Sequence, residues 1–221
     1  MAKILKAVFF DMDGVLVDTM KYHVAAWVGA FNHYGYYPDE LPFYLNEGVK
    51  HPKTVRDRLG ELGIDDVSDE LIEKIYTLKR KIYDQTVVIK PTDGVIELLE
   101  SLRGRVTIGL VTGGIPSVVT RVLQLFDDYF DLVVDYDSTT RGKPEADPYI
   151  LATQKAEVTK DTILAIENSP TGIASAVDAG LTCWAICTTL QPEYLARAHE
   201  IFSDFDALKQ RLYSAKEFII S

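Results

Sequence analysis

Four short apolar runs are the strongest constraint on the fold of this chain. They cover residues 7–10, 106–111, 163–166 and 183–186. Continuous apolar runs of this length are typical of strands whose two faces are both buried. The segments between them, such as residues 94–102 and 117–125, have apolar side chains at helical spacing. Strands that alternate with helices predict an α/β fold with a parallel sheet covered by helices on both faces.

Residues 18–90 follow a different pattern. They show helical periodicity in three stretches and contain no clear buried strand. Asp18 and Thr19 offer a helix cap at the start of this segment. We therefore predict a Rossmann-like core that carries an inserted all-helical cap domain. The predicted boundaries are residues 1–17 and 91–221 for the core and residues 18–90 for the insertion.

The charge balance limits the partners of the protein. The 221 residues include 23 Lys and Arg against 33 Asp and Glu, which gives a net charge of -10 at pH 7. Such a surface repels polyanions, which argues against nucleic acid or an anionic membrane as a partner. A small anionic substrate can still be held by a local cation. No uncharged run reaches membrane-spanning length, so we expect a cytoplasmic protein, a monomer or weak homodimer, that acts on a small molecule.

Two carboxylates, Asp11 and Asp13, follow the first apolar run. In an open parallel sheet the ligand lies beyond the carboxyl ends of the strands, so this position is a candidate site. The two carboxylates repel one another unless a cation or a proton offsets their charge, and Mg²⁺ is a hard cation that prefers oxygen ligands. One aspartate can then attack phosphorus as a nucleophile while the other serves as general acid and base.

Complementary groups stand after three later apolar stretches, residues 106–111, 132–134 and 163–166. Thr112, Gly113 and Gly114 offer a hydroxyl and backbone amides to a phosphoryl group. Lys143, in a Gly-Lys-Pro sequence, supplies a fixed positive charge. Glu167 adds a carboxylate that can complete a Mg²⁺ shell directly or through water. Four such groups in this order predict phosphoryl transfer through a covalent aspartate.

In these motifs the chain resembles the haloacid dehalogenase superfamily along nearly its whole length. The pattern Asp-x-Asp-Gly-Val, then Thr, then Lys-Pro, then an acidic residue carries the resemblance. The helical insertion looks like the cap of the subgroup that contains β-phosphoglucomutase and phosphoglycolate phosphatase. The resemblance implies that Asp11 is the nucleophile and that Asp13 is the general acid and base. It also implies that Thr112 and Lys143 bind the phosphoryl group, and that Asp11, Asp13 and Glu167 belong to the metal site.

The chain departs from the family pattern at Asn168, where many members have a second acid. The amide of Asn168 can offer an oxygen to Mg²⁺, although without a charge. It can instead orient Lys143 or Ser169. The residues alone do not choose between these roles, and we include Asn168 among the predicted metal ligands.

A second departure lies in the insertion. Mutases of this subgroup carry Lys-Gly-Val-Ser-Arg, whereas this chain has Glu-Gly-Val-Lys-His at residues 47–51. Loss of a bidentate arginine weakens the grip on a second phosphate. We therefore predict Mg²⁺-dependent hydrolysis of a small phosphomonoester, of sugar phosphate or phosphoglycolate type. A β-phosphoglucomutase-type mutase is the alternative, and a binding module without activity is the third hypothesis. We also predict that three residues of the insertion contact the substrate, namely His23, Lys50 and His51.

Overall fold

The computed structural model describes residues 3–126, 128–214 and 218–219. A six-stranded sheet with strand order β4-β3-β2-β5-β6-β7 forms its centre, and every pair of neighbouring strands is parallel. The strands are β2 (Ala7–Phe10), β3 (Thr107–Val111), β4 (Leu132–Val134), β5 (Ile163–Glu167), β6 (Thr182–Ile186) and β7 (Glu200–Phe202). Phe10 pairs with Leu110 on one side and with Ile166 on the other. The carboxyl ends of the three central strands therefore lie level, and the predicted α/β fold with a parallel sheet is confirmed.

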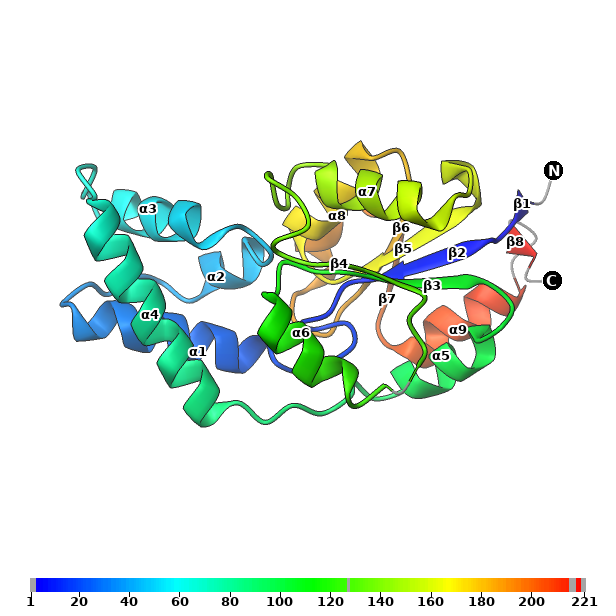
Figure 1. The fold of residues 1–221 in the computed structure, drawn as a ribbon, viewed down its shortest axis with the longest axis horizontal. Helices are drawn as coiled ribbons and strands as arrows, with labels where there is room; N and C mark the ends of the chain where they lie inside the picture. Colours follow the sequence, from blue (N-terminus) through cyan, green and yellow to red (C-terminus); the bar gives the residue numbers. More distant parts are fainter. Residues whose placement is uncertain (1–2, 127, 215–217, 220–221) are drawn as a thin grey trace.

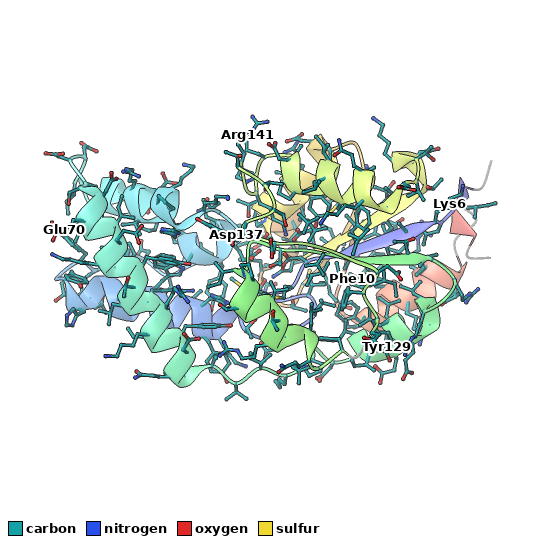
Figure 2. The ribbon with its side chains drawn as sticks, viewed as in Figure 1. Lys6, Phe10, Glu70, Tyr129, Asp137 and Arg141 are labelled. Carbon is teal, nitrogen blue, oxygen red and sulfur yellow. The ribbon has the colours of Figure 1, made fainter. Side chains whose placement is uncertain are left out.

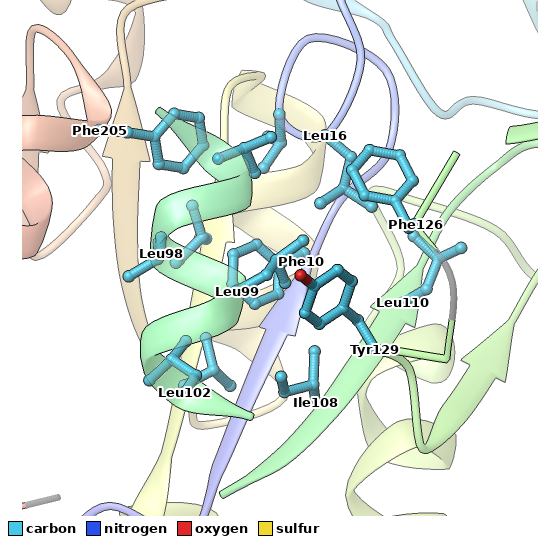
Figure 3. Packing of buried hydrophobic residues seen from close by; sticks show 14 of the residues in the cluster. Phe10, Leu16, Leu98, Leu99, Leu102, Ile108, Leu110, Phe126, Tyr129 and Phe205 are labelled. Atoms are coloured by element: carbon cyan, nitrogen blue, oxygen red, sulfur yellow. The ribbon is translucent and has the colours of Figure 1, made fainter. Parts of the chain in front are cut away.

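Helices cover both faces of the sheet (Figure 1). On one face lie α5 (Val95–Leu102), α6 (Pro116–Leu123) and α9 (Phe205–Ser214), and on the other lie α7 (Asp147–Ala156) and α8 (Pro170–Asp178). Successive residues of β2 point to opposite faces, so Phe10 joins one apolar cluster and Phe9 the other. Phe10 packs among Leu99, Ile108 and Tyr129 beneath α5 (Figure 3).

The helical insertion has a core of its own. It consists of α1 (Met20–His33), α2 (Leu41–Leu45), α3 (His51–Glu61) and α4 (Asp69–Thr86), which lie together beside one end of the sheet (Figure 1). Phe31, Leu59 and Ile75 are among the buried residues of its apolar cluster. The chain leaves the sheet and returns to it at one place, where Val17 and Pro91 form a β-bridge. The insertion therefore joins the core through two adjacent segments.

Several elements differ from the sequence prediction. The edge strand β7 is three residues long and only partly buried, so it lacks the apolar run by which the central strands were found. A short pair, β1 (Lys3–Ile4) with β8 (Phe218–Ile219), was likewise not predicted. Thr19 precedes α1, but its hydroxyl makes no capping hydrogen bond and turns instead to Asp13. Among the described residues, no helix combines the length and apolar character needed to cross a membrane.

A glycine in β3 allows the central strands to pack closely. A Cβ atom on Gly109 would lie 2.7 Å from Phe9 Cδ1 and 2.8 Å from Leu132 Cδ1. We expect Gly109→Ala to lower the free energy of unfolding by roughly 1–3 kcal/mol, the usual cost of overpacking a core. In the control Gly60→Ala, the nearest atom to the new Cβ in α3 is 4.0 Å away, and a gain of about 0.5–1 kcal/mol is expected. Urea unfolding measures both, and a Gly109→Ala variant as stable as the wild type would contradict the packing argument.

Candidate active site

The site forms where β2 ends. Figure 2 shows Lys6 at the end of the sheet away from the insertion and Phe10, the last residue of β2, nearer to it. Asp11 follows directly and is fully buried. The Lys143 ammonium lies 2.5 Å from Asp11 Oδ1 and 2.7 Å from Glu167 Oε1, and it also donates to the Val111 carbonyl at 3.0 Å. Three residues distant in the sequence thus form one buried ionic cluster.

The charges of this cluster do not balance. Burial raises the pKa of Asp11 to about 7, although Lys143 opposes this shift. Burial lowers the pKa of Lys143, but the carboxylates of Asp11 and Glu167 more than offset it, so the pKa is raised above its ordinary value and the ammonium keeps its proton. One cation is shared by two buried carboxylates, and Asp11 Oδ2 has no hydrogen-bond partner. The cluster can therefore accept a further cation.

Asp13 lies at the end of a hydrogen-bonded chain that comes from the insertion. Lys79 Nζ is 2.9 Å from His23 Nδ1, and His23 Nε2 is 3.1 Å from Asp13 Oδ1. The Thr19 hydroxyl donates to the same carboxylate oxygen. Because an ammonium can only donate, Nδ1 accepts and the ring proton resides on Nε2, where it is donated to Asp13. Burial raises the pKa of Asp13, but His23 and Thr19 outweigh burial and lower it below its usual value.

The loop after β3 carries the predicted hydroxyl and glycines. Thr112 is buried, and its Oγ1 accepts a hydrogen bond of 2.9 Å from the Gly114 amide. Gly113 approaches the insertion so closely that a Cβ atom there would lie 2.8 Å from Gly48 Cα. Gly113 and Gly114 line the cavity between the insertion and the core, and Thr112 lines a smaller space together with Lys143. Gly113 thus allows the loop to lie against the insertion.

Glu167 is the last residue of β5, and Asn168 follows it. The Tyr149 hydroxyl donates to Glu167 Oε1 at 2.8 Å, and the Asn168 main-chain N–H donates to Glu167 Oε2 at 3.2 Å. A Cβ atom on Gly172, in the first turn of α8, would overlap the Glu167 carboxylate, so this glycine makes room for the acid. Asn168 is fully buried and its Oδ1 has no partner.

The insertion contributes a third acid, Glu47. One carboxylate oxygen from each of Asp11, Glu47 and Glu167 lies within 4.8 Å of the other two. Glu47 Oε2 is inaccessible and unpartnered, and burial together with Asp11 raises the pKa of Glu47 well above its ordinary value. The Thr171 hydroxyl donates to the Glu47 carbonyl and ties this part of the insertion to the core. Such a set of oxygens is suited to a divalent cation.

Lys50 and His51 make contacts with protein groups. Lys50 Nζ donates to the carbonyls of Tyr136 at 2.9 Å and Thr139 at 2.8 Å, which belong to the core. The His51 ring stacks on Tyr76 at 3.7 Å between ring centroids, and its Nδ1 lies 3.1 Å from the Tyr136 hydroxyl. Lys50 therefore joins the insertion to the core, whereas His51 still lines the cavity between them.

That cavity lies next to Asp13. It has an apolar part and a polar part. The apolar lining includes Met20, Val24, Trp27, Phe43, Tyr76 and Val118, and the polar lining includes Glu47, His51, Lys79 and Arg80. A molecule of mixed character, with at least one anionic group, is suited to such a space.

Four residues that the structure brings to the site were not predicted from the sequence. Thr19 was interpreted as a helix cap, and Tyr149 was not considered. Glu47 was noted only as a lost lysine. A signal for Lys79 was available, because Ile72, Ile75, Lys79 and Tyr83 form the buried stripe of α4, and a lysine within such a stripe indicates a special environment.

The buried charge of Lys79 yields a stability prediction. Burial lowers the pKa of Lys79 from 10.5 to about 8, so the folded protein holds this charge less well than the unfolded chain does. We expect Lys79→Met to raise the free energy of unfolding at pH 7 by roughly 1–3 kcal/mol. The gain should shrink as the pH rises from about 8 toward 10.5, where Lys79 loses its proton in the folded state. Urea unfolding at several pH values, with the exposed Lys81→Met as control, tests this; no gain at pH 7 would refute it.

Comparisons with known proteins agree with the geometry. Residues 5–180 match the family of haloacid dehalogenase-like hydrolases. A phosphorylated carbohydrates phosphatase of Thermotoga maritima is 28% identical and covers 80% of this chain and 82% of its own. A pyrophosphatase of Bacillus pumilus is 26% identical and covers 68% of each chain. A solved structure from Bacteroides vulgatus, provisionally assigned as a β-phosphoglucomutase, is 28% identical, with a TM-score of 0.88 over 95% of this chain and 88% of its own. With four fifths of its length inside the family match and its charged groups at the ends of parallel strands, the chain belongs to the haloacid dehalogenase-like hydrolases.

Proposed function

We propose that the protein is a Mg²⁺-dependent phosphatase that hydrolyses small phosphorylated substrates through a phosphoryl group carried on Asp11. The buried cluster of Asp11, Lys143 and Glu167, with an unpartnered Asp11 oxygen, carries the proposal. The similarity to a phosphatase of phosphorylated carbohydrates supports a sugar phosphate as substrate. A cytoplasmic location, and a monomer or weak homodimer, stay predictions.

The oxygens of the site fit a magnesium ion. Asp11 Oδ2, Glu47 Oε2 and Asn168 Oδ1 are all buried without a hydrogen-bond partner, and oxygen donors of this kind are what Mg²⁺ prefers. We assign Asp11, Asn168 and the Asp13 backbone carbonyl as ligands from the core, with Glu47 and Glu167 close enough to act directly or through water. When bound, the metal supplies positive charge that lowers the pKa of Asp11 and offsets the charge of the phosphoryl group.

Asp11 is the nucleophile in this proposal. Its carboxylate attacks phosphorus in line with the departing oxygen, forming a bond from Asp11 to phosphorus and breaking the ester bond. Lys143 already binds Asp11 and can neutralise the phosphoryl oxygens as the bond forms. Thr112 and the amides of Gly113 and Gly114 provide further donors. Water then attacks the same phosphorus, which releases phosphate and restores Asp11.

Asp13 handles the protons. In its resting arrangement Thr19 and His23 hold it as a carboxylate, the form that takes a proton from the attacking water. A bound phosphoryl group places negative charge nearby, which raises the pKa of Asp13 and favours the protonated form that the leaving oxygen requires. Lys79 fixes the tautomer of His23. Because His23 and Lys79 belong to the insertion, the insertion acts as a cap that completes the groups needed for acid and base catalysis.

Hydrolysis of pyrophosphate is a second candidate, favoured by three observations. Lys79 and Arg80 line the cavity next to Asp13, where they can neutralise an anionic leaving group. The pyrophosphatase similarity points the same way. Glu47 also crowds the site from the side of the cap, which favours a small leaving group. A mutase needs a side chain that holds the second phosphate of its substrate, and in those enzymes an arginine does so. In this chain His51 takes that position and stacks on Tyr76, which disfavours a mutase.

A substrate panel tests these functions. Free phosphate is measured with Mg²⁺ and sugar phosphates, phosphoglycolate or pyrophosphate, and β-glucose 1-phosphate is checked for isomerisation. Asp11→Asn removes the nucleophile but keeps its shape, and we expect release to fall by at least 1,000-fold, on the order of the loss seen for a catalytic nucleophile. The folded variant should lose no stability without metal, because burial raises the pKa of Asp11 and thereby disfavours its charge. Isomerisation without release would establish a mutase, and neither activity would favour a binding module.

The metal site predicts a pH dependence. Without metal the pKa of Asp11 is about 7 and that of Glu47 is also raised, so part of the site is protonated at pH 6. A cation must displace these protons, and Mg²⁺ affinity should therefore rise between pH 6 and about pH 8. Calorimetry at pH 6 in two buffers of different ionisation enthalpy measures the protons released. Asp11→Asn should release fewer, and binding that is independent of pH would contradict the assignment.

A further inference from the structure

We propose that Thr189 is a positioning residue that orients the Asn168 amide, so that Asn168 presents its oxygen to the metal. This inference rests on the proposed function, because it concerns the ligand set of the Mg²⁺ site. Thr189 lies in the loop after β6, and Asn168 follows β5, the neighbouring strand. Thr189 thus approaches the site from a strand end that the catalytic mechanism does not use.

The hydrogen bonds between the two residues fix the direction of the amide. Asn168 Nδ2 donates to Thr189 Oγ1 at 3.1 Å. The Thr189 hydroxyl has one proton, which points to the Asn168 main-chain carbonyl at 3.5 Å. Its lone pairs are therefore left to face the side chain, and lone pairs can accept only from the NH₂ end of an amide. The Asn168 oxygen is turned away from Thr189.

The other end of the amide is prepared for a ligand. Asn168 is fully buried, and its Oδ1 has no hydrogen-bond partner. A buried amide oxygen without a partner costs free energy, and a bound cation would repay that cost. Asn168 adjoins Glu167, and β5 is paired with β2, the strand that Asp11 directly follows. An oxygen in this place can complete the ligand set.

The opposite side of the NH₂ group is also restricted. A Cβ atom on Gly14 would overlap Asn168 Nδ2 and would lie 3.0 Å from Thr189 Cγ2. Only glycine at this position lets the amide nitrogen fit between the two loops. The Thr188 hydroxyl donates to the Gly14 carbonyl, so the pair Thr188 and Thr189 holds the loop of Asp13 and the loop of Asn168 in one arrangement.

An asparagine needs this device, whereas an aspartate does not. The two oxygens of a carboxylate are equivalent, so either one can face the metal. An amide has one oxygen and one nitrogen, and a half turn about the Cβ–Cγ bond would aim NH₂ at the cation. Thr189 therefore matters in this chain because residue 168 is an amide.

The test uses Mg²⁺ binding, measured by calorimetry on the full chain at one pH. We expect Thr189→Val to weaken Mg²⁺ binding by about 10- to 100-fold, the usual effect of removing a partner of a metal ligand. Thr189→Ser keeps the hydroxyl and should bind within about threefold of the wild type. The decisive comparison is between Asn168→Asp alone and Asn168→Asp combined with Thr189→Val. In this background Thr189→Val should weaken Mg²⁺ binding by less than about threefold, because either oxygen of a carboxylate can face the metal. Unfolding curves without metal check that all four variants are folded.

Each outcome bears on the inference. It is overturned if Thr189→Val binds Mg²⁺ like the wild type, if Thr189→Ser is as weak as Thr189→Val, or if the penalty of Thr189→Val is equally large beside Asn168→Asp. The last result would indicate a general packing role. If the wild type binds no Mg²⁺, this inference falls together with the proposed metal dependence. If it binds Mg²⁺ with the expected pattern but releases no phosphate from any substrate, the proposed function fails and the role of Thr189 stands.

Discussion

The buried Lys143 ammonium, held between Asp11 and Glu167, is the interaction on which the rest of the structure depends. A charge without a partner is too costly to bury, and a buried pair survives only where hydrogen bonds complete it. The Tyr149 hydroxyl and the Val111 carbonyl supply those bonds. The cluster draws its members from the ends of two strands and one loop. The parallel sheet can therefore be understood as the frame that brings these ends level.

The insertion completes what the core begins. From the core alone the site has three buried carboxylates, Asp11, Asp13 and Glu167, against one lysine, Lys143. The insertion adds the Glu47 carboxylate on one side and the Lys79 ammonium on the other, the latter acting through His23. Both long side chains are costly to bury, and a helical packing unit gains nothing from them. The proposed function accounts for their burial, since Glu47 ends near Asp11 and Lys79 ends at His23, which contacts Asp13.

The sequence predicted the part of the site that depends on strand ends. Asp11, Lys143 and Glu167 were found because each follows an apolar run, and parallel strands end at the same edge. Contacts across the two parts of the molecule could not be found in this way. Lys50 was predicted to bind substrate, and in the structure its ammonium donates hydrogen bonds to two main-chain carbonyls of the core. Thr189 has no local pattern, because its role depends on a neighbouring strand. Edge strand β7 was missed because it is short and half-exposed.

The amide at Asn168 and the acid at Glu47 are best understood together. A carboxylate at residue 168 would add a fixed negative charge at the end of β5. The amide keeps an oxygen there without that charge, and Glu47 brings the charge back from the insertion. The electrostatic attraction for a cation then depends on the insertion, because the Glu47 carboxylate belongs to it. The neighbouring Gly48 packs against Lys143 and Gly113 of the core. Under the proposed function, a bound cation and this position of the insertion would favour one another, because Glu47 lies near Asp11 and Glu167 in this arrangement.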